Sequence, residues 1–131
     1  MDYVKKIDTP AATYTELDPL VTVLELTAGK LTGGWIYFPS GPAGKLHVSV
    51  WRGSHQLAPA NPEADYALDD TRVPLHLNYL LDTPPYQVEI KTWNESTTYE
   101  HTCTVCIFLE PIPIAQKKKQ IATALKKYFR S

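Results

Sequence analysis

Residues 86–93 read Tyr-Gln-Val-Glu-Ile-Lys-Thr-Trp, which is the most regular alternation of side-chain character in the chain. Because successive side chains of a β-strand point to opposite faces, this stretch predicts a strand with two different faces. One face should carry Tyr86, Val88, Ile90 and Thr92. The other face should carry Gln87, Glu89, Lys91 and Trp93. The alternation therefore indicates β structure at this point of the chain.

A second strand is expected close by, at residues 101–109, after a turn at residues 94–98. Its continuous apolar run, residues 105–109, indicates burial on both faces near its end. The only two cysteines, Cys103 and Cys106, lie in it three positions apart, which places them on opposite faces of a regular strand. A disulfide between them would require a bulge or a turn, so we expect two reduced, buried thiols and a reducing compartment.

Short apolar and β-branched stretches elsewhere predict further strands, separated by turn signals about every ten residues. The expected strands are residues 21–26, 31–38 with a bend at Gly33-Gly34, 46–51, 55–58 and, at a sheet edge because of Pro74, 73–77. Residues 59–70 predict a long loop, of a type that often carries function. Strands do not alternate with helices, which excludes a doubly wound parallel sheet. The predicted fold class is all-β: a small antiparallel β-sandwich or jelly-roll-like domain, with a small barrel as the alternative.

The chain has 131 residues, the size of a single domain, and 44% of them are hydrophobic, which excludes global disorder. We expect an N-terminal arm at residues 1–12, the β-sandwich at 13–112 and a basic amphipathic helix at 113–131. No apolar run of about 18 residues and no apolar signal core occur, so neither a transmembrane helix nor a secretory signal is expected. The expected place of synthesis is the cytoplasm.

The formal net charge of −1 conceals a division along the chain. Residues 115–131 carry six of the 13 lysines and arginines and no acid, whereas the rest carries seven bases and all 14 acids. This division indicates that the tail meets a negative surface: an acidic protein face of this or a neighbouring copy, a nucleic acid or an anionic membrane. The residues expected to make this contact are Lys117, Lys118, Lys119, Ile121, Leu125, Lys126, Lys127 and Phe129.

Residue types that bind metals occur at two places. The loop carboxylates that could bind Ca²⁺ are Glu63, Asp65, Asp69 and Asp70. Their spacing lacks the glycine and the terminal glutamate of a Ca²⁺ loop, so a solvated loop is the favoured interpretation. The motif His101-x-Cys103-x-x-Cys106 has zinc-ligand residue types, but on a strand Cys106 faces away from the other two. We expect no bound metal and no cofactor.

Catalytic signatures are missing from the sequence, which holds no nucleophile elbow, no phosphate-binding glycine loop and no paired-histidine zinc motif. We therefore expect no enzymatic activity and no small-molecule substrate. A cupin-like small-barrel enzyme would need a cluster of histidines, and the four histidines here are scattered.

Aromatic side chains are the candidate contact residues of the sandwich: Trp51, Trp93 and Tyr99. Packing in the core or between subunits is the favoured role, because aromatic side chains carry much of the buried area in both settings. A stacking platform for carbohydrate is the alternative. Asn94-Glu95-Ser96 matches the glycosylation sequon, which we attribute to chance because no signal sequence is visible.

Residues 38–44 (Phe-Pro-Ser-Gly-Pro-Ala-Gly) and 56–62 (Gln-Leu-Ala-Pro-Ala-Asn-Pro) resemble segments of small β-sandwich virion proteins of tailed phages, such as capsid decoration or tail components. The resemblance implies a symmetric homo-oligomer, commonly of three or more copies, with a capsid or other structural protein as partner and no enzymatic activity. It assigns no functional residue. The predicted function is a self-associating, non-enzymatic structural protein located in a virion. The alternatives are a carbohydrate- or other ligand-binding module and an adaptor whose basic tail binds nucleic acid or anionic membrane.

Overall fold

The computed structural model describes residues 1–61 and 63–112. These residues form eight strands and no helix. The predicted helix at residues 113–131 lies outside them. The strands are β1 (Asp2–Thr9), β2 (Leu20–Glu25), β3 (Gly29–Phe38), β4 (Leu46–Arg52), β5 (His55–Ala58), β6 (Thr71–Leu81), β7 (Gln87–Asn94) and β8 (His101–Pro111).

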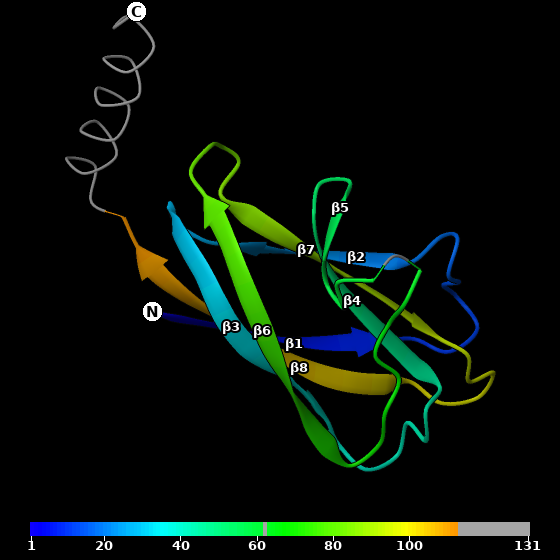
Figure 1. Cartoon of the computed structure of the whole chain (residues 1–131). Coiled ribbons are helices and arrows are strands. Elements are labelled where there is room, and N and C mark those ends of the chain that lie inside the picture. Colours follow the sequence, from blue (N-terminus) through cyan, green and yellow to red (C-terminus); the bar gives the residue numbers. More distant parts are fainter. Residues whose placement is uncertain (62, 113–131) are drawn as a thin grey trace, which may run out of the picture.

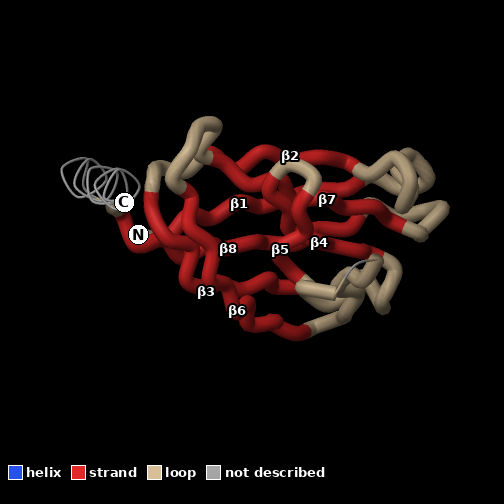
Figure 2. The backbone as a smooth tube through the Cα atoms, turned by 45° about the horizontal axis from the view of Figure 1, so that its top comes forward, coloured by secondary structure: helices blue, strands red, loops and turns tan. Residues whose placement is uncertain are grey.

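Two four-stranded antiparallel sheets stack face to face, as Figure 1 and Figure 2 show. Sheet A has the order β1-β8-β3-β6 and sheet B the order β2-β7-β4-β5. Strands from the two halves of the chain pair in reverse order: β1 with β8, β2 with β7, β3 with β6 and β4 with β5. The predicted all-β antiparallel sandwich is confirmed.

The hydrophobic core lies between the two sheets, and the alternation of each strand decides which side chains enter it. On β7 the face predicted to carry Val88, Ile90 and Thr92 points into the core, and these three residues are fully buried. The largest fully buried side chain is Phe38, at the end of β3. On β8 the predicted apolar run is also confirmed, because four of its five residues are buried: Val105, Cys106, Ile107 and Leu109.

The N-terminal arm predicted at residues 1–12 is wrong. Asp2–Thr9 pair along their whole length with β8, from Asp2 opposite Phe108 to Thr9 opposite His101. Thr9 is fully buried, and the Met1 ammonium donates to the Leu109 carbonyl at 2.7 Å. The segment is polar because it is an edge strand, where charged side chains protect the free hydrogen-bonding groups. The sandwich therefore begins at residue 2 rather than residue 13.

Strand boundaries differ from the expectations at two places. Strand β3 begins at Gly29, where a turn was expected, and its pairing shifts register between Leu31 and Gly33, which confirms the predicted bend. Strand β6 is 11 residues long instead of the expected five, because it pairs with the whole of β3. It is an edge strand of sheet A, as the prediction from Pro74 required.

Candidate functional site

The outer face of sheet B is hollowed. Three adjoining hollows of about 390, 370 and 310 Å³ lie along it, and the central one shares lining residues with both neighbours. We call them together the Trp groove, because Trp93 lines two of them and Trp51 lines the central one and the third. The further residues that line the central hollow are Glu16, Leu17, Pro19, Ser49, Gln56, Glu63, Ala64 and Lys91.

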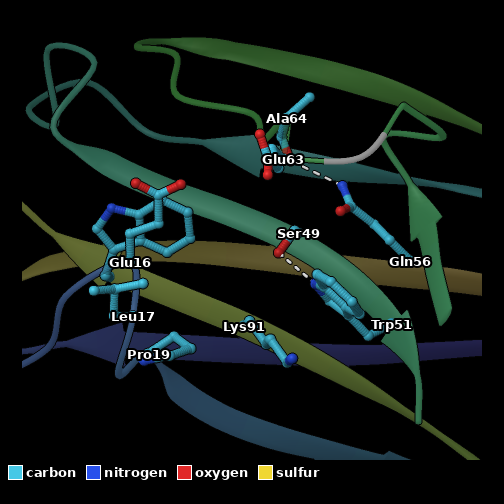
Figure 3. Close-up of a pocket in the computed structure, with 10 residues that line it drawn as sticks. Glu16, Leu17, Pro19, Ser49, Trp51, Gln56, Glu63, Ala64 and Lys91 are labelled. Carbon is cyan, nitrogen blue, oxygen red and sulfur yellow. Dashed lines mark hydrogen bonds between the residues drawn. The ribbon is translucent and has the colours of Figure 1, made fainter. Parts of the chain in front are cut away.

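Two loops rise over the strands to form the walls of the central hollow, as Figure 3 shows. Glu16, Leu17 and Pro19 come from the segment before β2, and Glu63 and Ala64 come from the loop between β5 and β6. Pairing of β7 with β2 and β4 supplies the floor. The groove is therefore assembled from segments that are distant in the sequence.

The floor of the groove is held by polar contacts among its own residues. The Trp51 indole N–H donates to Ser49 Oγ at 2.8 Å, and the Lys91 ammonium lies 3.9 Å from the centre of the Trp51 ring. Gln56 Nε2 donates to the carbonyls of Pro59 and Ala64, at 2.9 and 2.8 Å, which fixes the wall on that side. These contacts present a pre-formed surface.

His47 connects two loops, at residues 59–70 and 95–100, to the end of the groove. Its ring stacks on Trp93 with centroids 4.8 Å apart and planes within 5°. Its Nδ1 lies 2.7 Å from Asp65 Oδ1, a hydrogen-bonded contact. Its Nε2 lies 3.1 Å from Glu95 Oε1 without hydrogen-bond geometry. A histidine between two carboxylates thus braces the loops at residues 59–70 and 95–100 against sheet B.

The four loop carboxylates considered for Ca²⁺ have different surroundings. Asp65 contacts His47, and Asp69 accepts from the Ala43 and Gly41 amides at 2.9 Å each. These two hydrogen bonds, Ala43 first, hold the pKa of Asp69 below its usual value. Glu63 lines the groove, whereas Asp70 sits exposed beside β6 with a positive φ of 48°. No group of three or more metal-binding side chains converges within residues 1–61 and 63–112.

The predicted contact residues are brought together only in part. Trp51 and Trp93 both line the groove, whereas Tyr99 does not line any of its three hollows and its side chain is 69% exposed in the loop after β7. Lys91 was predictable as a neighbour, since the alternation placed it on the face of Trp93. Glu16 and Leu17 carried no sequence signal. The eight predicted tail residues lie outside the described part of the chain: Lys117, Lys118, Lys119, Ile121, Leu125, Lys126, Lys127 and Phe129.

The outer face of sheet A carries a second feature, an apolar row that crosses all four strands. Val4, Cys106, Trp35 and Pro74 are neighbours in register, one from each strand. Val4 is 57% exposed, Pro74 is exposed and Trp35 is half-buried. Tyr37, in the next row, is 41% exposed. We call Val4, Cys106, Trp35 and Pro74 the apolar row.

The two thiols lie on opposite faces of β8, as predicted, and both are free and buried. Cys103 points into the core, and Cys106 is the covered member of the apolar row. Burial, together with a smaller contribution from the charge of Asp8, raises the pKa of Cys103 to about 12. Burial also raises the pKa of Cys106. Neither thiol is an activated nucleophile, because such groups have lowered pKa values.

The Cys103 pKa predicts a loss of stability in alkali. Above pH 9 the unfolded chain releases this proton while the folded chain retains it until about pH 12, so the free energy of unfolding falls across that range and is unaffected below it. Between pH 7 and pH 10.5 the free energy of unfolding of the native chain should fall by about 2 kcal/mol more than that of Cys103→Val. Urea unfolding of both chains at the two pH values measures this difference. Equal losses would show that Cys103 ionises normally in the folded state.

The described residues define a protein of the all-β, two-sheet antiparallel sandwich class, with a groove on one outer face and an apolar row on the other. No protein-family model, curated protein or solved structure matches the chain. No helix in the described part of the chain is long and apolar enough to cross a membrane.

Proposed function

We propose that the protein is a non-enzymatic structural protein that assembles with copies of itself through the outer face of sheet A. The observation that carries this proposal is the apolar row. Val4 and Pro74 are exposed in this row, and Trp35 is half-buried with the Arg72 guanidinium 4.9 Å from the centre of its ring. Apolar side chains aligned in this way across all four strands of a sheet are typical of surfaces that contact other proteins.

Charge around the apolar row favours a second copy as the partner. Acidic Asp2 and basic Lys6 and Arg72 lie in the registered rows beside it, and acidic Asp8 lies one row further out on β1. Both signs are therefore present on one face, and an identical face can meet it without net repulsion. A face that is self-complementary in this way suits the symmetric contacts that homo-oligomers use.

The architecture supports the same proposal. We infer that the sandwich is a jelly roll, because its strands pair like a long hairpin folded on itself, β1 with β8 through to β4 with β5. Jelly rolls of eight strands occur in capsid proteins and lectins. A place in a virion, with a capsid or tail protein as further partner, follows from the resemblance to tailed-phage proteins and is part of the proposal.

Two glutamates placed on the sheet A face should dissociate the assembly. Val4→Glu with Tyr37→Glu adds charge to two exposed positions, so folding should be spared while a buried interface would contain unpaired carboxylates. We expect at least a tenfold rise in the dissociation constant, from light scattering after size-exclusion chromatography over a wide concentration range.

The matched control is Val23→Glu with Leu68→Glu, which changes two side chains of similar exposure, 44% and 40%, outside sheet A. It should retain the mass of the native assembly. A native chain that stays at 14.7 kDa at every concentration would overturn self-assembly. Equal dissociation by both double variants would overturn the sheet A face as the contact.

A further inference from the structure

We propose that the Trp groove of one copy binds the basic C-terminal segment, residues 113–131, of a neighbouring copy. The inference rests on the self-assembly proposed above, because the occupant comes from a second chain. It adds a second contact, on sheet B, to the one on sheet A, and it assigns a partner to the acidic body and to the basic tail.

The charge of the groove selects a basic occupant. Three carboxylates line its hollows, Glu16, Glu63 and Glu95, and neither Glu16 nor Glu63 forms an ion pair within the part of the chain that the structure describes. The one lysine that lines the central hollow, Lys91, has its ammonium over the Trp51 ring. Residues 113–131 bring six lysines and arginines and no acid. Opposite charges of this kind steer association and determine which partner binds.

Apolar side chains of the groove would stay exposed to water if the bound segment carried only charged side chains. Leu17 is 97% exposed on the rim of the central hollow, on the wall that also carries Pro19, and Ala64 lines the opposite wall. The C-terminal segment carries Ile121, Leu125 and Phe129 at four-residue spacing between its lysines. A segment with both apolar and basic side chains therefore matches both features of the groove.

A saccharide fits the groove less well, although two tryptophans line it. Stacking of a sugar needs an open ring face. Trp93 is only 9% exposed and its ring stacks on His47, while one face of the Trp51 ring lies under the Lys91 ammonium. The two indoles contribute shape and apolar surface, and the carboxylates above them carry the recognition.

The path of the chain points to a neighbouring copy. Strand β8 belongs to sheet A, whereas the groove lies on the outer face of sheet B. Figure 1 shows that β8 begins at the end of the sandwich where the loops before β2 and after β5 lie, and that it ends at the opposite end. A strand of this length spans roughly 35 Å. To reach its own groove, the segment would have to pass around an edge of the sandwich from sheet A to the outer face of sheet B. A further copy, placed with the outer face of its sheet B at the end of β8, offers its groove without this passage.

Disulfide trapping between two full-length variants tests the contact. One chain carries Leu17→Cys on the groove rim together with an added tag, and the other carries Ile121→Cys in the tail. The native thiols are buried and do not compete. After mixing under mild oxidation, we expect the mixed disulfide dimer to exceed the same product made with Leu68→Cys, an exposed site outside the groove, by at least fivefold.

Charge reversal adds a test of specificity. Lys117→Glu, Lys118→Glu and Lys119→Glu in the tail chain should reduce the mixed dimer at least fivefold. Glu16→Lys, Glu63→Lys and Glu95→Lys in the groove chain should restore it. Yields that do not respond to either reversal would overturn the recognition by charge.

Light scattering on the same proteins separates this inference from the proposed function. A native chain of multi-chain mass with no mixed dimer above the Leu68→Cys level overturns the groove contact and leaves self-assembly standing. A monomeric native chain overturns both. An intrachain disulfide in one chain that carries Leu17→Cys and Ile121→Cys, with no mixed dimer, would show that the tail folds onto its own groove. Binding of duplex DNA or anionic vesicles that depends on the three lysines, again with no mixed dimer, would assign the tail to those partners instead.

Discussion

Replacing Gly34 by alanine is expected to destabilise the protein by about 4 kcal/mol or more, which is a large part of the roughly 5–15 kcal/mol that stabilises a domain. A methyl group on Gly34 would lie 2.0 Å from the Cys106 carbonyl oxygen and 3.2 Å from the Ile107 Cα, and both are backbone atoms of β8. The φ of Gly34, +155°, is itself one that residues with side chains rarely adopt. Relief would require β3 and β8 to separate. Urea unfolding followed by circular dichroism measures the loss.

Gly53→Asn is the matched control for Gly34→Ala. Gly53 has a positive φ of 60°, but no atom lies within 4 Å of the place where its Cβ would stand. Asparagine tolerates this φ better than most residues, and the backbone N–H keeps its bond to Glu89 Oε2. We expect a change within about 1 kcal/mol. If Gly34→Ala changed the free energy of unfolding as little as Gly53→Asn, the close approach of β3 and β8 would be wrong.

Gly34 also connects the fold to the proposed contact face. It follows the register shift between Leu31 and Gly33 and precedes Trp35 on β3. Close approach to β8 at this point sets Trp35 opposite Cys106 on one side and Pro74 on the other. The apolar row is continuous because this glycine lets the two central strands of sheet A lie together.

The strands that local chemistry specifies were predictable from the sequence. The two-residue period of β7 separates Val88 and Ile90 from Glu89 and Lys91, and the structure buries the apolar pair. The run at the end of β8 has no period because Cys106 is buried and Phe108 half-buried on its outer face, while Val105, Ile107 and Leu109 are buried on its inner face. Gly33-Gly34 and Pro74 correctly indicated a bend and an edge, since each residue type restricts the backbone in a known way.

Features that depend on pairing between distant segments were not predictable. Strand β1 shows no clear apolar period, because it is an edge strand whose partner lies about a hundred residues further along the chain. The groove is a similar case: Glu16 and Leu17 meet Trp51 only after β2 pairs with β7 and β7 with β4. The loop carboxylates are the opposite case, because they are close in sequence but their side chains do not lie at one point.

Asn94, which the sequence presents as part of a glycosylation sequon, has a structural role instead. Its side-chain amide donates to the Thr9 carbonyl at 3.1 Å and to the Tyr99 carbonyl at 2.9 Å, and its Oδ1 accepts from the Ser96 amide at 2.9 Å. The residue is only 2% exposed. One side chain therefore joins β7, the end of β1 and the loop that carries Glu95 to the groove.

Asn94→Ala is expected to lower the free energy of unfolding by about 3 kcal/mol, because it leaves buried groups of Thr9 and Ser96 without their partners. Urea unfolding measures the loss, and hydrogen exchange should accelerate at the Ser96 amide. The control is Thr98→Ala in the same loop, an exposed side chain whose backbone N–H supplies its hydrogen bond to Ser96 Oγ, with a change within about 0.5 kcal/mol. If the two variants unfolded alike, Asn94 would not be the tie between β1 and this loop. If Asn94→Ala also weakened the trapped contact between groove and tail, the loss would show that Glu95 recognises the tail only when the loop is held in place.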